Sequence, residues 1–124
     1  MNFYPKKKPR LFSVGSKRKV TIKDCGQIEL SYDEQITFIS KDGHEYDVAR
    51  KDWGFYATPS LNRRLPSFNL RAALVKNQDT LFYIMLVEKG KETIFEKYIK
   101  DEESTIICWM DNTEDLLKID SAFK

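Results

Sequence analysis

The chain has 124 residues, of which 41% are hydrophobic, 13% aromatic and 32% charged, a balance that predicts a folded domain rather than a disordered segment. Its longest apolar run, residues 81–87, is much shorter than the roughly 20 residues that a membrane-spanning helix needs, and the amino-terminal segment lacks the apolar stretch of a secretion signal. We therefore expect a cytoplasmic protein with no membrane span.

The charge is unevenly distributed, although the net charge is only +2. Residues 1–24 contain eight Lys and Arg residues against one acid, Asp24, whereas the other hundred residues contain thirteen basic and eighteen acidic ones. We predict a basic, flexible arm over residues 1–19 and a single globular domain over residues 20–124. Such an arm suits a nucleic acid, an anionic membrane surface or an acidic protein face, or it is a solvated tail.

Few residues are suited to binding a metal or a cofactor. The two cysteines, Cys25 and Cys108, are far apart in sequence, and His44 is the only histidine. No Cys/His spacing typical of zinc sites occurs, and no glycine-rich phosphate-binding motif is present. We expect no metal, no cofactor and two free thiols.

Turn residues recur at short intervals after residue 20, which is typical of a meander of antiparallel strands. Residues 19–23 and 27–32 alternate polar and apolar positions on either side of Gly26, and we expect them to form a hairpin. Residues 35–40 and 44–50 flank an Asp-Gly pair, the strongest short signal for a hairpin.

Alternation also predicts the faces of the strand over residues 44–50. Tyr46 and Val48 share one face, and Glu45 and Asp47 share the other, which we expect to be solvated. Paired carboxylates can catalyse glycoside hydrolysis, but two acids on one wet strand face are the simpler interpretation.

Aromatic residues dominate the next predicted strand, residues 53–58, and a loop follows at 59–67 because prolines at both ends interrupt strand pairing. Two further strands are joined by a turn at 77–79. The apolar run at 81–87 predicts a central strand covered on both faces, Tyr83 included.

The carboxyl-terminal third changes period. Residues 91–102 form a predicted amphipathic helix, residues 104–110 a strand that runs parallel to residues 81–87 through a crossover, and residues 113–119 a short acidic helix or tail. We therefore predict an α+β fold, with a twisted, mainly antiparallel sheet covered on one face by one amphipathic helix. A small β-barrel is the alternative.

Catalysis requires a nucleophile, a base and an orienting group close together. His44 follows the Asp-Gly turn directly, where we expect a solvated side chain, and Cys25 lies in the predicted turn at Gly26. A Cys25 or His44 enzyme is therefore a secondary hypothesis.

The aromatic segment offers a stronger candidate site. Trp53 and Phe55 share one face of a strand and Tyr56 takes the other, so at least one ring faces outward unless both faces are covered. A loop with Asn62, Arg63 and Arg64 follows. A ring beside guanidinium groups suits a sugar, a base or an anionic group, whereas the alternative is that the rings fill the core and the arginines pair with acids.

The run EYDVARKDWGFYATPSLNRRL, followed by LVKN and MLVEKGKE, resembles short uncharacterised bacterial proteins from gene neighbourhoods for cell-surface polysaccharide synthesis. The resemblance spans residues 20–110 and implies an accessory role in a sugar pathway. It implies no catalytic residues.

We predict a small non-catalytic binding protein whose partner is an anionic or carbohydrate-like small molecule or another protein. The predicted ligand-binding residues are Trp53, Tyr56, Asn62, Arg63 and Arg64. The alternative is a protein that binds single-stranded nucleic acid through its basic arm, where rings alternate with positive charge. The residues of that alternative site are Lys6, Lys7, Lys8, Arg10, Lys17, Arg18 and Lys19.

Overall fold

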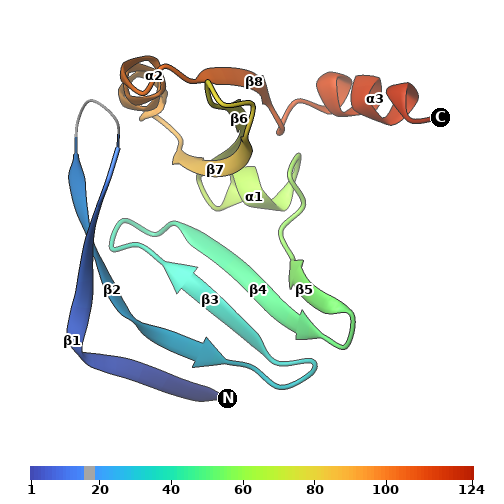
Figure 1. Ribbon diagram of the computed structural model, residues 1–124. Helices are drawn as coiled ribbons and strands as arrows, with labels where there is room; N and C mark the ends of the chain where they lie inside the picture. The colour runs from blue at the N-terminus through green and yellow to red at the C-terminus, as the bar shows by residue number, and fades with distance from the viewer. Residues whose placement is uncertain (16–18) are drawn as a thin grey trace. The chain divides into compact units, whose positions relative to one another are not determined.

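The computed structural model describes residues 1–15 and 19–124 and confirms the α+β class, with mostly antiparallel strands (Figure 1). The amino-terminal elements are β1 (Asn2–Val14), β2 (Val20–Glu29), β3 (Gln35–Ile39), β4 (Glu45–Lys51) and β5 (Gly54–Ala57). The later ones are α1 (Arg64–Ser67), β6 (Leu70–Lys76), β7 (Phe82–Glu88), α2 (Glu92–Asp101), β8 (Thr105–Trp109) and α3 (Thr113–Ala122). The described strands form three open sheets, β1-β2, β3-β4-β5 and β7-β6-β8, rather than the alternative barrel.

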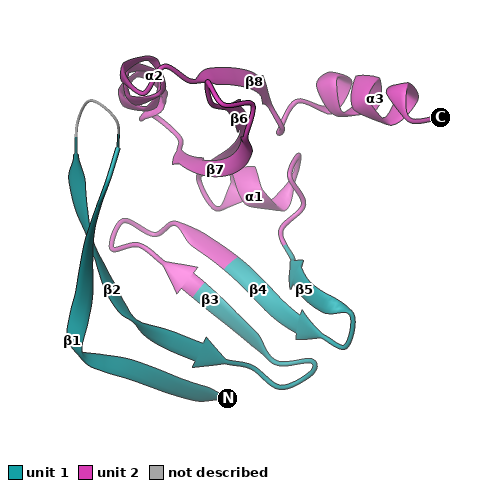
Figure 2. Ribbon diagram, viewed as in Figure 1, with its two compact units in different colours: residues 1–37, 47–58 teal, residues 38–46, 59–124 magenta. Residues whose placement is uncertain are grey.

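The described chain divides into two compact units (Figure 2). Unit 1 comprises residues 1–37 and 47–58, and unit 2 comprises residues 38–46 and 59–124. The boundary crosses the chain three times, because the tip of the β3–β4 hairpin belongs to unit 2.

Residues 2–14 of the predicted arm form a paired strand, β1. β1 runs antiparallel to β2, and β2 passes straight through Gly26, so the predicted hairpin at that glycine is wrong. Gly26 has φ +150° and lies opposite Pro5, where the two backbones approach closely. Its missing side chain therefore permits close strand pairing rather than a turn.

The β3–β4 hairpin at Asp42-Gly43 has the expected position. Gly43 has φ +92° and its amide donates to the carbonyl of Ser40. Asp47, which we expected to be solvated, is instead 6% exposed and accepts a hydrogen bond from Thr37 Oγ1 at 2.6 Å. A neighbouring polar partner thus allows a carboxylate on the covered face.

The central strand of the unit 2 sheet is β6, not the apolar β7. β6 pairs antiparallel with β7 on one side and with β8 on the other, and its small residues Ala72 and Ala73 are fully buried. β7 is an edge strand, and Tyr83 is 44% exposed. β8 nevertheless runs in the same direction as β7, as expected, with β6 between them.

The helices agree with the predicted pattern. α2 begins and ends within one residue of the predicted helix, and α3 begins after Asn112, whose side chain accepts a hydrogen bond from the Asp115 amide. The expected loop at 59–67 ends in the short helix α1. None of the described helices is long and apolar enough to cross a membrane.

The buried apolar side chains of the described residues all lie in unit 2. One cluster contains Leu65, Leu70 and Ala72, and the other contains Ala73, Val75 and Ile99, to which α2 contributes the last. In unit 1, by contrast, large apolar and aromatic side chains remain at the surface. The aromatic segment therefore lies in a thin, weakly buried part of the protein.

Candidate functional site

The three rings of the aromatic segment are all at the surface. Trp53 is 68% exposed, Phe55 65% and Tyr56 50%. The centroids of Trp53 and Tyr56 lie 6.4 Å apart with their planes tilted by 48°. β5 is an edge strand that pairs only with β4 among the described residues, and exposed rings, Phe55 and Tyr56, stand on its two faces, so neither face is fully covered. The segment is therefore a surface and not a core.

The predicted polar residues lie in the other unit. Asn62 Nδ2 donates to Thr113 Oγ1 at 3.1 Å, the Arg64 guanidinium lies 5.4 Å from the Phe68 ring centroid, and Arg63 is exposed. Trp53 and Tyr56 belong to unit 1, whereas these three residues belong to unit 2. Neither unit by itself contains all five predicted residues, because the boundary between the units falls at Pro59, between the two rings and the three polar residues.

Arg50 is the cation that the sequence interpretation missed. Its guanidinium carbon lies 5.1 Å from the centroid of the Tyr32 ring and 5.1 Å from that of Phe55 (β4 and β5 in Figure 1). Nη1 donates to the carbonyl of Gly54 at 2.9 Å and also to that of Lys51. No carboxylate of the described residues pairs with Arg50, so its Nε and Nη2 groups keep their donors available.

The register explains why Arg50 is placed there. Arg50 pairs directly with Phe55 across the antiparallel β4–β5 ladder, so their side chains share a face. The two-residue connection Asp52-Trp53 fixes that register. The sequence contains a signal for this pair, because a two-residue turn at Asp52-Trp53 places Arg50 opposite Phe55.

A hollow of about 590 Å³ opens beside this arginine, and we call it the Arg50 pocket. Its lining residues are Tyr4, Gln27, Ile28, Glu29, Leu30, Arg50 and Phe55. Glu29 accepts hydrogen bonds from Tyr4 Oη at 3.0 Å and from Asn2 Nδ2 at 3.4 Å. The hydrogen bond to the Glu29 carboxylate raises the pKa of Tyr4. The pocket thus combines a cation, a carboxylate, an amide and an exposed ring.

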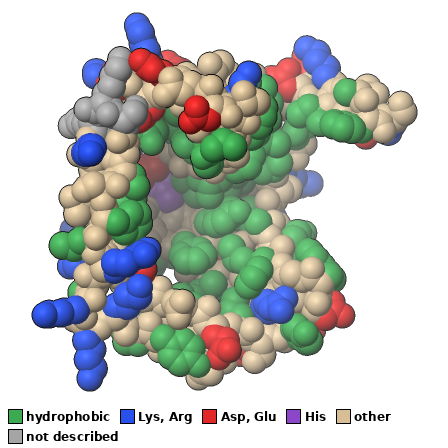
Figure 3. Space-filling model, viewed as in Figure 1, with side chains coloured by type: hydrophobic (Ala, Val, Ile, Leu, Met, Phe, Trp, Pro, Cys, Tyr) green, Lys and Arg blue, Asp and Glu red, His purple; other side chains and the backbone are tan. Residues whose placement is uncertain are grey.

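Lys6, Lys7, Lys8 and Arg10 lie on β1 of the β1–β2 ribbon, from which Lys and Arg side chains project (Figure 3). Lys6 Nζ is 2.7 Å from Asp24 Oδ2, and this hydrogen bond is the main cause of the lowered pKa of Asp24. Arg10 lies 3.6 Å from the same oxygen. Lys7, Lys8 and Lys19 are exposed. Lys17 and Arg18 lie outside the described residues.

Cys25 and His44, the two residues named for the catalytic alternative, lie in different units. Cys25 is an exposed free thiol on β2 in unit 1, whereas His44 belongs to unit 2. The side chain of His44 is 13% exposed rather than solvated, with Nδ1 2.7 Å from Ser40 Oγ and 3.6 Å from Glu88 Oε1.

Both of those groups face the same ring nitrogen, so they do not form a serine–histidine–carboxylate relay, which uses the two nitrogens separately. Glu88 also pairs with Lys91 at 2.7 Å. The Lys91 hydrogen bond chiefly, with the His44 charge, lowers the pKa of Glu88. The described residues contain no cluster of three metal-ligating side chains.

The second free thiol, Cys108, lies on β8 in unit 2, beside a separate and larger hollow. In unit 1, the candidate ligand site is the Arg50 pocket, all of whose lining residues belong to that unit. No family model, curated protein or solved structure matches the chain.

Proposed function

We propose that the chain is a cytoplasmic, non-catalytic binding protein that recognises a carbohydrate bearing a carboxylate or phosphate group in the Arg50 pocket. The observation that supports this most is the Arg50 guanidinium, which lies 5.1 Å from the centroids of two exposed rings, Tyr32 and Phe55, and has no carboxylate partner among the described residues. Such an accessory role agrees with the sugar-pathway resemblance of the sequence.

Each side of a sugar finds a suitable group in this pocket. The apolar C–H face of a pyranose packs against an aromatic ring, and Phe55 is exposed for that contact. Arg50 presents paired N–H donors to an anionic oxygen. Glu29 accepts hydrogen bonds from ring hydroxyls, and Gln27 both donates and accepts.

The mixed polarity favours a sugar over a simple anion. A site for phosphate alone would not place a carboxylate beside the cation, because the two negative groups repel each other. An acidic sugar separates its anionic group from its hydroxyls by several ångströms. It can therefore contact Arg50 and Glu29 at different atoms.

Trp53 and Tyr56 are a second pair of exposed rings in unit 1. Tyr56 pairs with Ala49 on the opposite face of the β4–β5 ladder from Phe55. Trp53 and Tyr56 are thus a separate stacking surface and not a continuation of the Arg50 pocket. Asn62, Arg63 and Arg64 have no assigned role in this proposal.

Isothermal titration calorimetry with glucuronic acid and glucose, and then with oligosaccharides of each, tests the proposal. We expect the acidic sugar to bind more tightly, with Arg50→Ala and Phe55→Ala each weakening it about tenfold, or about 1.4 kcal/mol. Arg63→Ala is the matched control and should leave the affinity unchanged. Equal heats for the wild type and both pocket variants would reject the assignment.

Binding of single-stranded nucleic acid is the second candidate. Unit 1 contains ten basic and six acidic residues, hence a charge of +4, and it exposes several rings. In fluorescence anisotropy with a labelled oligonucleotide, this candidate requires an affinity that falls steeply with salt and is lost in the double variant Lys7→Gln and Lys8→Gln. Carbohydrate binding requires neither result.

A further inference from the structure

The outer edge of β8 is unpaired in the described part of the chain. β8 pairs only with β6, through Thr105, Ile106, Cys108 and Trp109, and it is the last strand of the β7-β6-β8 sheet. A free edge presents a row of backbone N–H and C=O groups, which another strand can pair with. Proteins usually cover or obstruct such an edge, so the residues around β8 indicate whether this edge can bind another strand.

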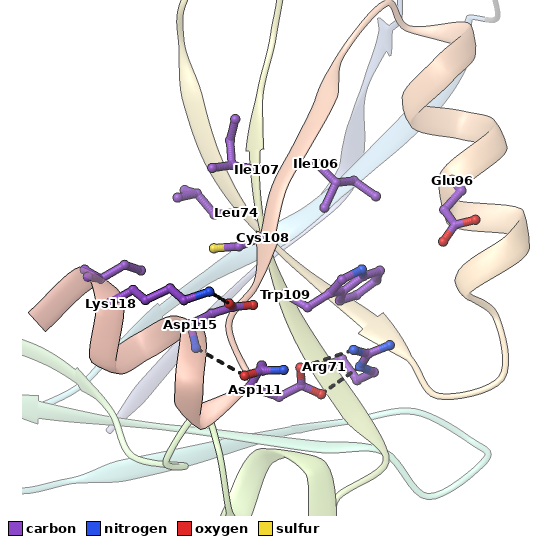
Figure 4. Close-up of a pocket in the computed structure, with 12 residues that line it drawn as sticks. Arg71, Leu74, Glu96, Ile106, Ile107, Cys108, Trp109, Asp111, Asp115 and Lys118 are labelled. Carbon is purple, nitrogen blue, oxygen red and sulfur yellow. Dashed lines mark hydrogen bonds and ion pairs between the residues drawn. The ribbon is translucent and has the colours of Figure 1, made fainter.

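Two helices flank this edge and leave a groove of about 970 Å³ along it, which we call the β8 groove (Figure 4). Glu96 lies on the α2 side, and Asp115 and Lys118 lie on the α3 side. The floor is mostly apolar and consists of Leu74, Ile106, Ile107, Cys108 and Trp109, with Ile119 on α3.

A β-bulge shapes the floor. The register against β6 shifts between Leu74 and Val75, which leaves Ile107 without a partner, and Ile107 is 48% exposed. Bulges re-aim side chains and are frequent beside binding sites. The extra residue supplies an exposed apolar contact in the middle of the edge.

The groove has an excess of negative charge. Arg71 is occupied: Nε and Nη2 lie 2.7 and 3.2 Å from the Asp111 carboxylate oxygens, and Nη1 lies 3.2 Å from Glu92. The Asp111 hydrogen bond is the main cause of the raised pKa of Arg71, whose guanidinium also stacks 4.1 Å from the Trp109 ring centroid. Lys118 lies 3.7 Å from Asp115.

Glu96 remains exposed, and no cation of the described residues pairs with it. A basic partner would complete the charge balance. Pairing of β8 with the β8 edge of a second copy would instead bring two acidic grooves together, which like charges disfavour.

We propose that the β8 edge binds an extended, basic segment of a partner protein by strand addition. The segment pairs its backbone with Thr105–Trp109, places alternate apolar side chains on the floor, and directs Lys or Arg side chains toward Glu96. The site lies wholly in unit 2 and is independent of the Arg50 pocket.

Fluorescence anisotropy with a labelled eight-residue peptide that alternates Lys and Val tests this proposal on the full chain. We expect saturable binding that weakens at least tenfold when Glu replaces Lys. It should weaken as much when alternate amides are N-methylated, because that peptide keeps its charge but cannot complete the backbone ladder. Equal binding of the N-methylated peptide would show adsorption by charge alone and would overturn strand addition.

Protein variants locate the site. Glu96→Lys should weaken binding of the Lys-Val peptide about tenfold, whereas Glu45→Lys, the same charge change on an exposed residue of β4, should not. Circular dichroism checks that both variants are folded. Equal loss in the two variants would overturn the assignment to the groove. So would sedimentation that shows a dimer which excludes the peptide, since a second copy would then be the occupant.

Discussion

Arg71 is the residue at which the polar contacts of unit 2 converge. Its side chain is 25% exposed and joins Asp111 on the segment after β8 to Glu92 at the start of α2, while its guanidinium covers Trp109. Two carboxylates depend on one cation. Removal of the cation therefore leaves two partly buried negative charges unpaired, a change that costs more than the loss of a surface ion pair.

We expect Arg71→Ala to lower the free energy of unfolding of unit 2 by about 2 kcal/mol, and Arg71→Lys by about 1 kcal/mol because lysine keeps the charge but not the fork or the stacking. Urea unfolding, followed by Trp109 fluorescence in a Trp53→Phe background, measures both. Arg63→Ala is the control and should have little effect. If Arg71→Ala lowered the free energy of unfolding no more than this control, the contacts of Arg71 with Asp111 and Glu92 would contribute nothing to stability.

For single residues, the sequence predicted burial correctly where it follows from local pattern, and incorrectly where it depends on partners from other parts of the chain. Exposure of at least one ring in the aromatic segment followed from strand alternation. Asp47 and His44 could not be placed, because Thr37, Ser40 and Glu88 supply the contacts that allow them to be covered.

Elements with their own periodicity, and the hairpins at Asp42-Gly43 and at 77–79, were predicted well, whereas the β1–β2 pairing and the choice of the central strand were not. The α2 helix and the Asp42-Gly43 hairpin follow from local signals. The choice of β6 over β7 as central strand depends on which strand has neighbours on both sides. Apolar content favours β7, but small residues such as Ala72 and Ala73 permit the close packing of β6.

Gly26 shows how one position decides an element. A Cβ at Gly26 would lie 2.5 Å from the carbonyl oxygen of Tyr4, whereas a Cβ at Gly54, which has a similar φ of +146°, would meet nothing within 4 Å. Substitution of either glycine therefore strains the backbone, but only substitution of Gly26 also disrupts the pairing of β1 with β2.

We expect Gly54→Ala to cost about 1 kcal/mol from strain alone and Gly26→Ala about 3 kcal/mol because β1 must also move away from β2. Hydrogen exchange of peptides from β1 and β2 measures the difference. Protection of this ribbon should fall sharply in Gly26→Ala and stay near the wild-type level in Gly54→Ala. Equal loss in both variants would show that the close approach of the strands does not matter.

At the scale of the whole molecule, the two units differ in how much apolar surface they bury. Both apolar clusters of the described residues lie in unit 2, whereas Asp47, at 6% exposure, is the one buried residue that the described part of unit 1 contains. Apolar burial is the dominant favourable contribution to folding, so unit 1 has the weaker driving force. A chain with such unequal units need not unfold in one step.

We therefore expect native-state hydrogen exchange to separate the units along the chain. Amides of β6 and of the α2 turn that holds Ile99 should exchange only through opening of unit 2, while those of β1, β2 and β5 should exchange earlier, at lower urea concentrations. The acidic sugar that we propose for the Arg50 pocket should slow exchange in unit 1 selectively, since a ligand stabilises the state to which it binds. Uniform exchange across both units would mean that they fold as one, and the unequal burial would then have no thermodynamic consequence.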